Sequence, residues 1–573
     1  MASISPRSSV TFIPSRPATG NAESDRPERI TASPVFEEAQ RIEHDIEQYG
    51  GDEPHEPLSR TSTLSSPSLP PSKSAKSAAK DPNLVTWDGP DDPENPHNWS
   101  KSYRWLMMVV VIIMTVNTTF ASSAPTATVF ALSEHFHVSK EVSYLVTTTF
   151  LLGYIFGPFL WGPGSELVGR RPIFVVTMFA YTVFHLGQAL APNIQTLLVT
   201  RFFAGFFAVA PLSNSGGVIS DMFPAEDRGL AASLFAAGVF LGPTLGPLIS
   251  GFIIDNGVSW RWVFWVMMIF AGACTFVVIV WLPETYAPVL LLRKAKRLRK
   301  ADPVGNANLY AEHERQDWSF YGIVLRTVWR PFHMLLLEPI LVLITIYISI
   351  VYGLLYGLFE AFPIIFIVRR GFTIGQDGLI FIGVGIGTTI GALINVYMSR
   401  NYAQLVRKWK GFPPPEERLP SGMVGAVALV IATFWLGWTG EYKSIPWYVP
   451  ALSTVLLGTG ISLIFMSFLT YLVDTYLIYS ASAFAANTII RSAAGAAFPL
   501  FTVQMFENLH INWAATLIGL IALLFAPSPF LFYKYGARIR QKSRFAPGID
   551  LKIAKELEEE ERARREEEKG ITV

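Results

Sequence analysis

Four charged residues stand inside or at the end of long apolar stretches, and their chemistry needs explaining first. Arg201, Glu360 and Arg491 lie within such stretches, and Asp474 closes another. A charge in hydrocarbon costs roughly 2.5–3.5 kcal/mol even on insertion scales, so it usually faces a partner or a water-filled cavity. A carboxyl group among apolar groups holds its proton to a higher pH than one in water. The four residues therefore predict a proton pathway through the apolar part of the chain.

Each of the four has an expected role. We expect Glu360, one turn before Pro363, to carry protons, and Arg201 to control proton binding by a nearby carboxylate. Asp474 is expected to pair with Arg491 or to act as a gate residue on the cytosolic side. The alternative for Arg201 is a position near the membrane surface, from which its long side chain reaches water.

The apolar stretches dominate the composition. Half of the 573 residues are hydrophobic, 16% are charged, and the mean hydropathy is +0.34, whereas a soluble protein carries about 25% charged residues. Stretches of about 20 apolar residues match the ~30 Å hydrocarbon layer, where the backbone must satisfy its own hydrogen bonds as a helix. The fold class is therefore an all-α polytopic membrane protein, with spans expected at 103–125, 139–161, 172–191, 196–220, 229–254, 261–282, 340–366, 376–398, 421–440, 447–472, 482–506 and 512–534.

Basic residues divide the loops into two sets. Lys and Arg gather in the loops around 170–171, 293–300 and 400–410 and after the last span, and the opposite loops hold few. Basic loops face the cytosol, so both termini are expected there. We expect the plasma membrane, with the vacuolar membrane as the alternative.

The spans divide into two groups of six. Polar, Ser- and Pro-rich residues 1–100 predict a disordered cytosolic tail. A six-helix bundle at 101–283, a cytosolic linker loop at 284–338 and a second six-helix bundle at 339–535 follow. Residues 536–573 form a charged cytosolic tail, in which 558–569 predicts a solvated helix. Two six-helix bundles around a central cavity are a transporter plan, with the substrate near the midplane.

Several motifs carry a resemblance to a known family. The loop after the second span, Gly162-Pro-Gly-Ser-Glu166-Leu-Val-Gly169-Arg170-Arg171, resembles the G-x-x-x-D-x-x-G-R-[KR] signature of the major facilitator superfamily. Span four holds Arg201-Phe-Phe-Ala-Gly205, similar to the R-x-x-x-G motif of its proton-coupled antiporters. Span five holds Gly238-Val-Phe-Leu-Gly242-Pro243-Thr-Leu-Gly246-Pro247, similar to G-x-x-x-G-P-x-x-G. With Leu282-Pro283-Glu284-Thr285 after span six and the stretch 87–93 before span one, residues 85 to 540 resemble the twelve-span drug:proton antiporter family, in its fungal multidrug and polyamine-type branch.

The resemblance implies a conformational latch and an antiporter kink. Glu166 would pair with Arg170, or through an arginine with Asp221, and close the cytosolic side in the outward-facing state; Gly162 and Gly169 would allow a tight turn and close helix approach, and Arg171 completes the signature. The alternative is a basic loop without a switching role. The glycines and prolines of span five would kink the helix, limit leak and favour export, with helix packing as the alternative.

The sequence also departs from the family pattern. Glu166 stands where the family usually has Asp, which keeps the charge, and Leu167 stands where a basic residue is common. Asn117 in span one occupies a region where some relatives place a carboxylate. The proton-carrying acid is therefore the least defined part of the resemblance.

The expected function is proton-coupled export, by alternating access, of amphipathic small molecules such as drugs, fungicides, or a secondary metabolite or toxin. Transport of a polyamine, a polar nutrient or an organic acid is the alternative, and a polyamine exporter should line its cavity with several acids. A receptor or scaffold is the third class, and neither tail resembles the large folded domain that it would need. The candidate cavity residues are Asn117, Phe150, Tyr154, Tyr356, Phe359, Phe362 and Tyr471.

Other chemistry is not indicated. The sequence has no P-loop for ATP hydrolysis and no nucleophile with an adjacent base, so we expect neither an enzyme nor a cofactor, and a proton gradient as the energy source. Scattered histidines predict no metal site, and the single cysteine, Cys274, excludes internal disulfides. A net charge of +1 gives no sign of nucleic acid. The glycine run 383–391 imitates a nucleotide loop but lies in a span, so it predicts helix packing. The expected partners are small molecules, protons and lipid, and we expect a monomer.

Overall fold

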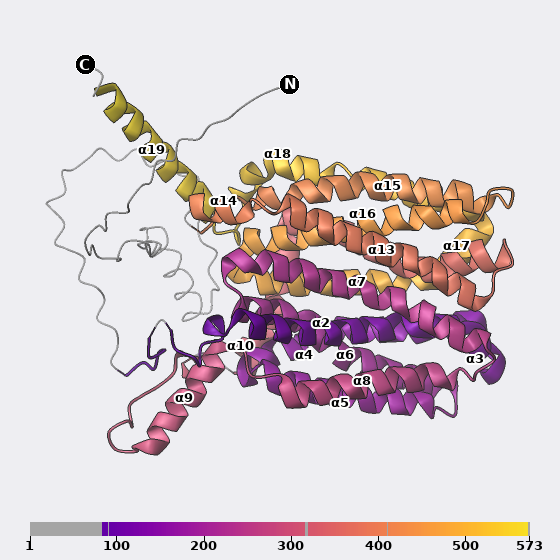
Figure 1. Ribbon diagram of the computed structural model, residues 1–573, viewed down its shortest axis with the longest axis horizontal. Helices are drawn as coiled ribbons and strands as arrows, with labels where there is room; N and C mark the ends of the chain where they lie inside the picture. The colour runs from indigo at the N-terminus through magenta and orange to yellow at the C-terminus, as the bar shows by residue number, and fades with distance from the viewer. Residues whose placement is uncertain (1–82, 90, 316–318, 410, 571–573) are drawn as a thin grey trace, which may run out of the picture.

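Long helices lie side by side in two stacked groups (Figure 1). The computed structural model describes residues 83–89, 91–315, 319–409 and 411–570. The first group, the N half, contains α2 (Lys101–Ser123), α4 (Lys140–Val168), α5 (Arg170–Ala189), α6 (Ile194–Met222), α7 (Ala225–Asp255) and α8 (Arg261–Trp281). The second group, the C half, contains α12 (Pro339–Phe362), α13 (Ile374–Met398), α15 (Leu419–Glu441), α16 (Tyr448–Tyr476), α17 (Ser480–Phe525) and α18 (Ser528–Arg540).

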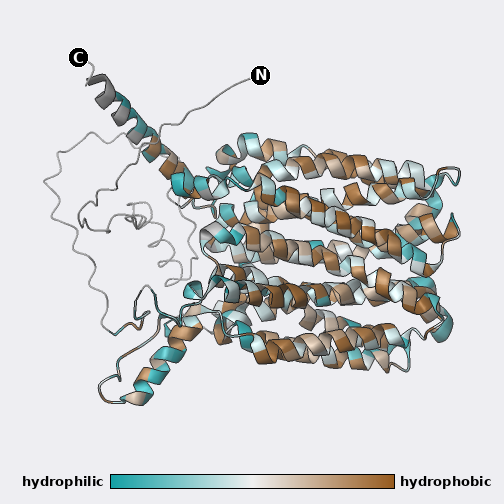
Figure 2. Cartoon of the chain, viewed as in Figure 1, coloured by the Kyte–Doolittle hydropathy of each residue, from teal (hydrophilic) through white to brown (hydrophobic). Residues whose placement is uncertain are grey.

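Eleven helical stretches of the described residues are long and apolar enough to cross a membrane. Brown, hydrophobic residues cover these helices in Figure 2, and teal residues gather at their ends. The last stretch, 480–540, has 61 residues and would be about 90 Å long as one straight helix, three times the ~30 Å hydrocarbon layer. It must therefore hold more than one crossing.

The chain reverses direction at His510. This residue has φ 62° and ψ 162°, outside the helical region. The amide of Ile511 donates to Glu441, the last residue of α15, over 3.0 Å, whereas Arg540 donates to Glu416, just before α15 begins. Residues 511–540 thus run antiparallel to α15 along its whole length. The eleven stretches therefore contain twelve helical passes at the positions of the predicted spans. The last one, 512–534, continues from α17 across the turn at Ala526 and Pro527 into α18.

Polar caps fix where several spans begin. Ser100, Ser139 and Asn193 accept backbone N–H groups at the starts of α2, α4 and α6, and Thr373 forms a capping box with Gln376 at α13. Such caps satisfy amides that have no partner inside the helix. They mark the spans to within a few residues of their predicted starts.

The two halves contact each other mainly along two helix pairs, α7 with α13 and α4 with α17. A Cβ on Gly378 would lie 2.6 Å from the Pro247 carbonyl oxygen, so the α7–α13 crossing is close enough to require glycine. We name the end where α2 begins and α18 finishes the terminal end, and the opposite end the distal end. The Thr148 hydroxyl of α4 donates to the Ala496 carbonyl of α17 over 3.0 Å.

The expectation of a disordered tail through residue 100 is wrong for 83–89 and 91–99. Residues 1–82 lie outside the described part of the chain. Val85 and Tyr310 are joined by a 2.9 Å backbone hydrogen bond, and Lys294 pairs with Asp88 at 2.7 Å and with Asp92 at 3.3 Å. Lys294 belongs to α9 (Ala287–Ala301), one of three linker helices with α10 (Phe320–Val324) and α11 (Arg330–Leu337).

The predicted helix in the C-terminal tail is confirmed as α19 (Ile549–Gly570), which projects from the terminal end in Figure 1. Its first turn is held by Arg540, which is 2% exposed and donates to both carboxylate oxygens of Asp550 at 2.8 Å. The same guanidinium group bonds Glu416 at 2.8 and 3.0 Å. The tail is thus attached to the C half before it extends outward.

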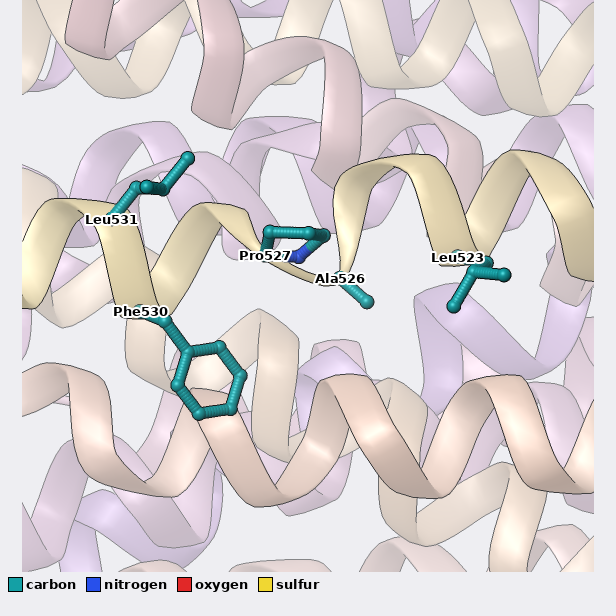
Figure 3. Close-up of a pocket in the computed structure, with 5 residues that line it drawn as sticks. All are labelled: Leu523, Ala526, Pro527, Phe530 and Leu531. Carbon is teal, nitrogen blue, oxygen red and sulfur yellow. The ribbon is translucent and has the colours of Figure 1, made fainter.

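Figure 3 shows a hollow at the break between α17 and α18. It has a volume of about 300 Å³ and is lined by Leu523, Ala526, Pro527, Phe530 and Leu531. None of these side chains carries a polar group, and Leu523, Phe530 and Leu531 are exposed. The hollow therefore offers no side-chain group that could orient a polar substrate.

Candidate functional site

Arg201 lies deep inside the N half and is fully buried. Its Nε donates to the Val146 carbonyl of α4 and its Nη1 to the Ala121 carbonyl of α2, both over 2.9 Å. The guanidinium carbon lies 4.2 Å from the centre of the Phe150 ring. The alternative position near the membrane surface is therefore wrong, because no part of this side chain reaches water.

No carboxylate pairs with Arg201 among the described residues, although one was expected nearby. Its Nη2 has no hydrogen-bond partner, and neither polar atom of the buried Asn117 side chain has one. Tyr181 donates to the Asn117 backbone carbonyl over 3.3 Å. Carbonyl oxygens and aromatic rings thus surround the charge, and a role of Arg201 in proton coupling stays a prediction.

Arg491 is the second buried cation, in α17 of the C half. It is 5% exposed, and its guanidinium carbon lies 5.2 Å from the ring centre of Tyr352 and 4.9 Å from that of Phe465. Its Nε has no partner among the described residues. The expected pairing with Asp474 is wrong, because Asp474 lies at the terminal end and is held by Arg418 over 2.8 Å.

Three buried tyrosines, Tyr154, Tyr352 and Tyr356, lie between the two arginines, and we name them the central tyrosine cluster. Tyr154 belongs to α4 and is an electrostatic neighbour of both arginines; the other two belong to α12. The Tyr356 hydroxyl lies 2.8 Å from Ser122 Oγ of α2, so α12 of the C half contacts α2 of the N half here. Sequence reasoning selected Tyr154 and Tyr356 but missed Tyr352, one helical turn before Tyr356.

The other candidate cavity residues lie in different surroundings. Phe150 packs under Arg201, while Phe359 and Phe362 both contact Phe381 of α13 at the distal end, with ring centres 5.2 and 4.7 Å apart. Tyr471 stacks on Phe532 of α18 near the terminal end, inside the C half. The prediction that Tyr471 lines the cavity is wrong, because its ring packs on a helix of the C half and not at the contact between the halves.

Glu360 is 4% exposed and lies in the last turn of α12, at the distal end. Its Oε1 has no hydrogen-bond partner in the described chain. Tyr144 of α4 and Asp377 of α13 are its polar neighbours. Asp377 is 5% exposed and also has an unpartnered oxygen, Oδ1. The sequence analysis missed Asp377, although its place in the first turn of a span was a usable signal.

The loop between α4 and α5 forms the cluster that the family signature predicts. We name Ser165, Arg170, Asp221 and Glu284 the N-half cluster. Arg170 Nε pairs with Asp221 at 3.3 Å, Nη1 donates to the Ser165 hydroxyl, and the Arg170 amide donates to Glu284 Oε1 over 2.8 Å. Glu284 also accepts from the amides of Thr285 and Tyr286 at 3.1 Å. A buried carboxylate thus caps the start of α5 and fixes Arg170.

Two details of this cluster differ from expectation. Glu166 forms no hydrogen bond or ion pair with described residues, since Arg170 and Asp221 pair directly. A Cβ on Gly162 would meet no atom within 4 Å, so Gly162 serves no close approach here. Gly169 has φ +103°, and a Cβ there would overlap the Glu284 carboxylate. Arg171 donates to the Ile279 carbonyl over 3.0 Å.

The C half contains a matching ion pair that sequence reasoning did not assign. Arg418, just before α15, pairs with Asp474 in the last turns of α16 at 2.8 Å. The Tyr402 hydroxyl donates to the same Asp474 oxygen over 2.7 Å, and its ring centre lies 3.4 Å from the Arg418 guanidinium carbon. We name Tyr402, Arg418 and Asp474 the C-half cluster.

The glycines of the antiporter motif line the face of α7 that packs on α2. A Cβ on Gly238 would lie 2.9 Å from Ile112, one on Gly242 would lie 2.6 Å from the Phe120 amide, and one on Gly246 would lie 2.8 Å from the Ala124 amide. The helix assignment of α7 continues through Pro243 and Pro247, and the expected kink at these prolines stays a prediction. The motif permits close packing. The glycine run 383–391 likewise packs on α16, as predicted: a Cβ on Gly387 would overlap the Val455 carbonyl.

Comparisons with known proteins agree with this architecture. Residues 106–499 match the family model described as Major Facilitator Superfamily. The chain is 44% identical over 478 residues to the MFS-type efflux pump MFS2 of Trichophyton rubrum, covering 83% of this chain and 79% of the relative. It is 43% identical to the citrinin biosynthesis cluster MFS transporter mrr1 of Monascus ruber, covering 82% and 94%.

A further relative, the multidrug transporter mdrA of Aspergillus fumigatus, is 41% identical, covering 84% of this chain and 79% of its own. Among solved structures, the proton:xylose symporter XylE bound to a bromodeoxyglucose superimposes with a TM-score of 0.57 at 18% identity, covering 79% of this chain and all of XylE. At that identity the likeness concerns the fold.

Proposed function

Because the chain belongs to the Major Facilitator Superfamily, we propose that it exports drug-like molecules or a secondary metabolite in exchange for protons. It is an integral membrane transporter rather than an enzyme. Export is supported by the names of its relatives, an efflux pump, a multidrug transporter and a biosynthesis-cluster transporter. The proposed orientation puts the terminal end in the cytosol, because the basic loops lie there.

The observation that carries proton coupling is the buried carboxyl group of Glu360. It lies at the contact between α12 and Tyr144 of α4, with an unpartnered oxygen and with Asp377 as a second buried acid nearby. Two neighbouring acids without a cation partner in the described chain cannot both carry charge cheaply. They would hold a proton in one state and release it in another.

Alternating access would then link this proton to the clusters at the terminal end. At the terminal end, the N-half cluster joins α4, α5 and α6, and the C-half cluster joins the start of α15 to the end of α16. Rocking the halves along α7–α13 and α4–α17 would change the solvent access of Glu360. A proton bound at the distal end would be released at the terminal end, while substrate moves the opposite way.

The variant Glu360→Gln tests this proposal in cells that lack their own pumps. Gln keeps the shape but cannot exchange a proton, so the efflux of an azole should fall at least about tenfold, equivalent to about 1.4 kcal/mol. A protonophore should reduce wild-type efflux and have little further effect on the variant. The matched control is Glu417→Gln, which neutralises an exposed acid and should leave efflux unchanged at equal surface expression. Protonophore-sensitive efflux at the wild-type rate by Glu360→Gln would remove this carboxyl group from the mechanism.

A further inference from the structure

The centre of the protein contains two buried positive charges and no paired negative charge among the described residues. Arg201 and Arg491 approach the central tyrosine cluster from opposite halves. The nearest acids that the structure describes on α12 and α13, Glu360 and Asp377, lie at the distal end. Arg491 is about 16 Å along α17 from its start, which puts it well inside the hydrocarbon layer. An uncompensated cation at that depth requires a functional explanation.

The polar atoms that the chain leaves unused at this place are mostly donors. They include Nε of Arg491, Nη2 of Arg201 and Nδ2 of Asn117, all buried and without a partner in the described chain. Buried donors are nearly always satisfied in native proteins, so each unsatisfied one indicates a missing acceptor. Carboxylate and phenolate oxygens are the acceptors that a guanidinium group binds most strongly.

The surroundings of Arg491 are also aromatic, and Tyr352, Tyr356 and Phe465 are each 3% exposed or less. Tyr352 and Phe465 lie nearly parallel, with ring centres 6.5 Å apart, and both face the guanidinium group. The Tyr356 ring lies 5.0 Å from that of Tyr352. A planar aromatic compound can contact such rings while its charged oxygen reaches the arginine.

We propose that the substrate site takes an amphipathic organic anion, a carboxylate or acidic phenol, whose charge is bound by Arg491 and whose ring system packs on Tyr352, Tyr356 and Phe465. This inference rests on the proposed export function and names the class of its substrate. Arg201 is held by two backbone carbonyls, so it acts as a positioning residue that adds positive potential. A polyamine would meet two like charges here and is disfavoured.

Export of such an anion is compatible with proton exchange. An anion that leaves the cell and protons that enter both move down an inside-negative membrane potential. The anion and the protons bind at different sites, the anion at the centre of the protein and the protons at the acids of the distal end. The two parts of the mechanism can therefore be tested separately.

The experiment compares two dyes on the same xanthene ring system, anionic carboxyfluorescein, loaded as its diacetate ester, and cationic rhodamine 6G. In pump-deficient cells that express the full chain, we expect carboxyfluorescein efflux to exceed rhodamine 6G efflux. Arg491→Gln should lower carboxyfluorescein efflux about ten- to a hundredfold, the loss of one charge-assisted bond, without lowering rhodamine 6G efflux. Arg491→Lys, which keeps the charge but loses the planar guanidinium fork, should be intermediate.

The matched control is Arg400→Gln, which removes the same charge from an exposed position after α13 and should change neither dye. A wild-type protein that exports only rhodamine 6G, or neither dye, would overturn the inference, as would an equal loss of both dyes in Arg491→Gln. Carboxyfluorescein efflux that depends on Arg491 but is insensitive to a protonophore would instead refute proton coupling. Protonophore-sensitive efflux of rhodamine 6G, together with carboxyfluorescein efflux that Arg491→Gln does not lower, would keep proton coupling and refute the anion site.

Discussion

The two halves stabilise their terminal ends with the same ion pair in different surroundings. In each half an arginine at the start of the third long helix pairs with an aspartate near the end of the fourth: Arg170 with Asp221, and Arg418 with Asp474. The N-half pair is supported by Glu284, which caps α5 and also bonds Arg293 of the linker at 3.3 Å. The C-half pair is supported by the ring and hydroxyl of Tyr402.

The different support of the two ion pairs explains why only the loop of the N half carries the family signature. The glycine and arginine pattern of the loop before α5 was recognisable because Gly169 must adopt φ +103° beside the Glu284 carboxylate. Among the described residues, the C-half cluster has no such carboxylate cap. The loop before α15 also holds a glycine at positive φ, Gly411 at +100°, but a Cβ there would meet no atom within 4 Å, so no side chain of the cluster requires it. The ion pair is common to both halves, and the glycine signature describes only the way in which the N half builds it.

The first prediction compares the loss of each arginine. Arg170 and Asp221 have side chains 9% and 12% exposed, against 12% and 23% for Arg418 and Asp474. Removing one partner of a buried pair costs roughly 3–5 kcal/mol, so Arg170→Ala should lower the thermal midpoint in detergent strongly and abolish efflux. Arg418→Ala should lower the thermal midpoint and the efflux rate less, because Asp474 keeps its hydrogen bond from Tyr402 and is partly exposed to water.

The control for this comparison is the pair of aspartate variants. Asp221→Asn and Asp474→Asn keep the side-chain shape and remove the charge, so their effects should follow the same order. If Arg418→Ala proved more damaging than Arg170→Ala at equal surface expression, the carboxylate cap would not be the stronger support.

The second prediction separates the two glycines of the N-half signature. Gly169→Ala puts a Cβ into the Glu284 carboxylate at a φ that side chains rarely adopt, which costs roughly 1–3 kcal/mol. Efflux and thermal midpoint should both fall. Gly162→Ala adds its Cβ to open space and should leave the thermal midpoint unchanged. A Gly162→Ala variant with normal stability but impaired efflux would instead indicate a close approach in the other facing state.

The fold followed from sequence because hydrocarbon leaves the backbone little choice. The predicted spans coincide with helical segments, apart from the turn at 526–527 inside the last one. The chain reversal at His510, inside α17, lies between the spans predicted at 482–506 and 512–534. Residues 83–99 were missed because their order depends on Lys294, about 200 positions further along the chain. Composition alone cannot reveal such a distant partner.

The candidate site was harder to predict than the fold because burial of a charge does not identify its partner. Arg201 and Arg491 were found from their apolar neighbours, yet their surroundings are carbonyls and rings rather than acids. Asp474 was assigned to Arg491 because Arg418 lies just outside the predicted span 421–440. Asp377 was missed because it is the second residue of the span predicted at 376–398. An acid is common in the first turn of a helix, since it interacts favourably with the free backbone amides.

The smallest expected effect concerns the attachment of residues 83–99, which has no counterpart in the C half. The pKa of Asp92 is lowered by the amides of Asp88 and Glu94, which donate to it at 3.0 and 2.9 Å, and by Lys294. A carboxyl group with a depressed folded-state pKa contributes stability above its ordinary value of about 3.9, and that stability is lost as pH falls through the depressed value. Hydrogen exchange of 83–99 in the full chain should therefore be slow at pH 7 and accelerate only below about pH 4.

Asp92→Asn should already accelerate that exchange at pH 7, because an amide oxygen accepts the same bonds more weakly and leaves Lys294 with Asp88 alone. Burial by itself would lower the pKa of Lys294, but the two aspartates outweigh it and raise that pKa in the wild type. The first turn of α19, held by Arg540 rather than by α9, is the internal control and should exchange at the wild-type rate. Equal acceleration in both segments would mean that Asp92 supports the whole terminal end, and the attachment of 83–99 would then be no separate unit.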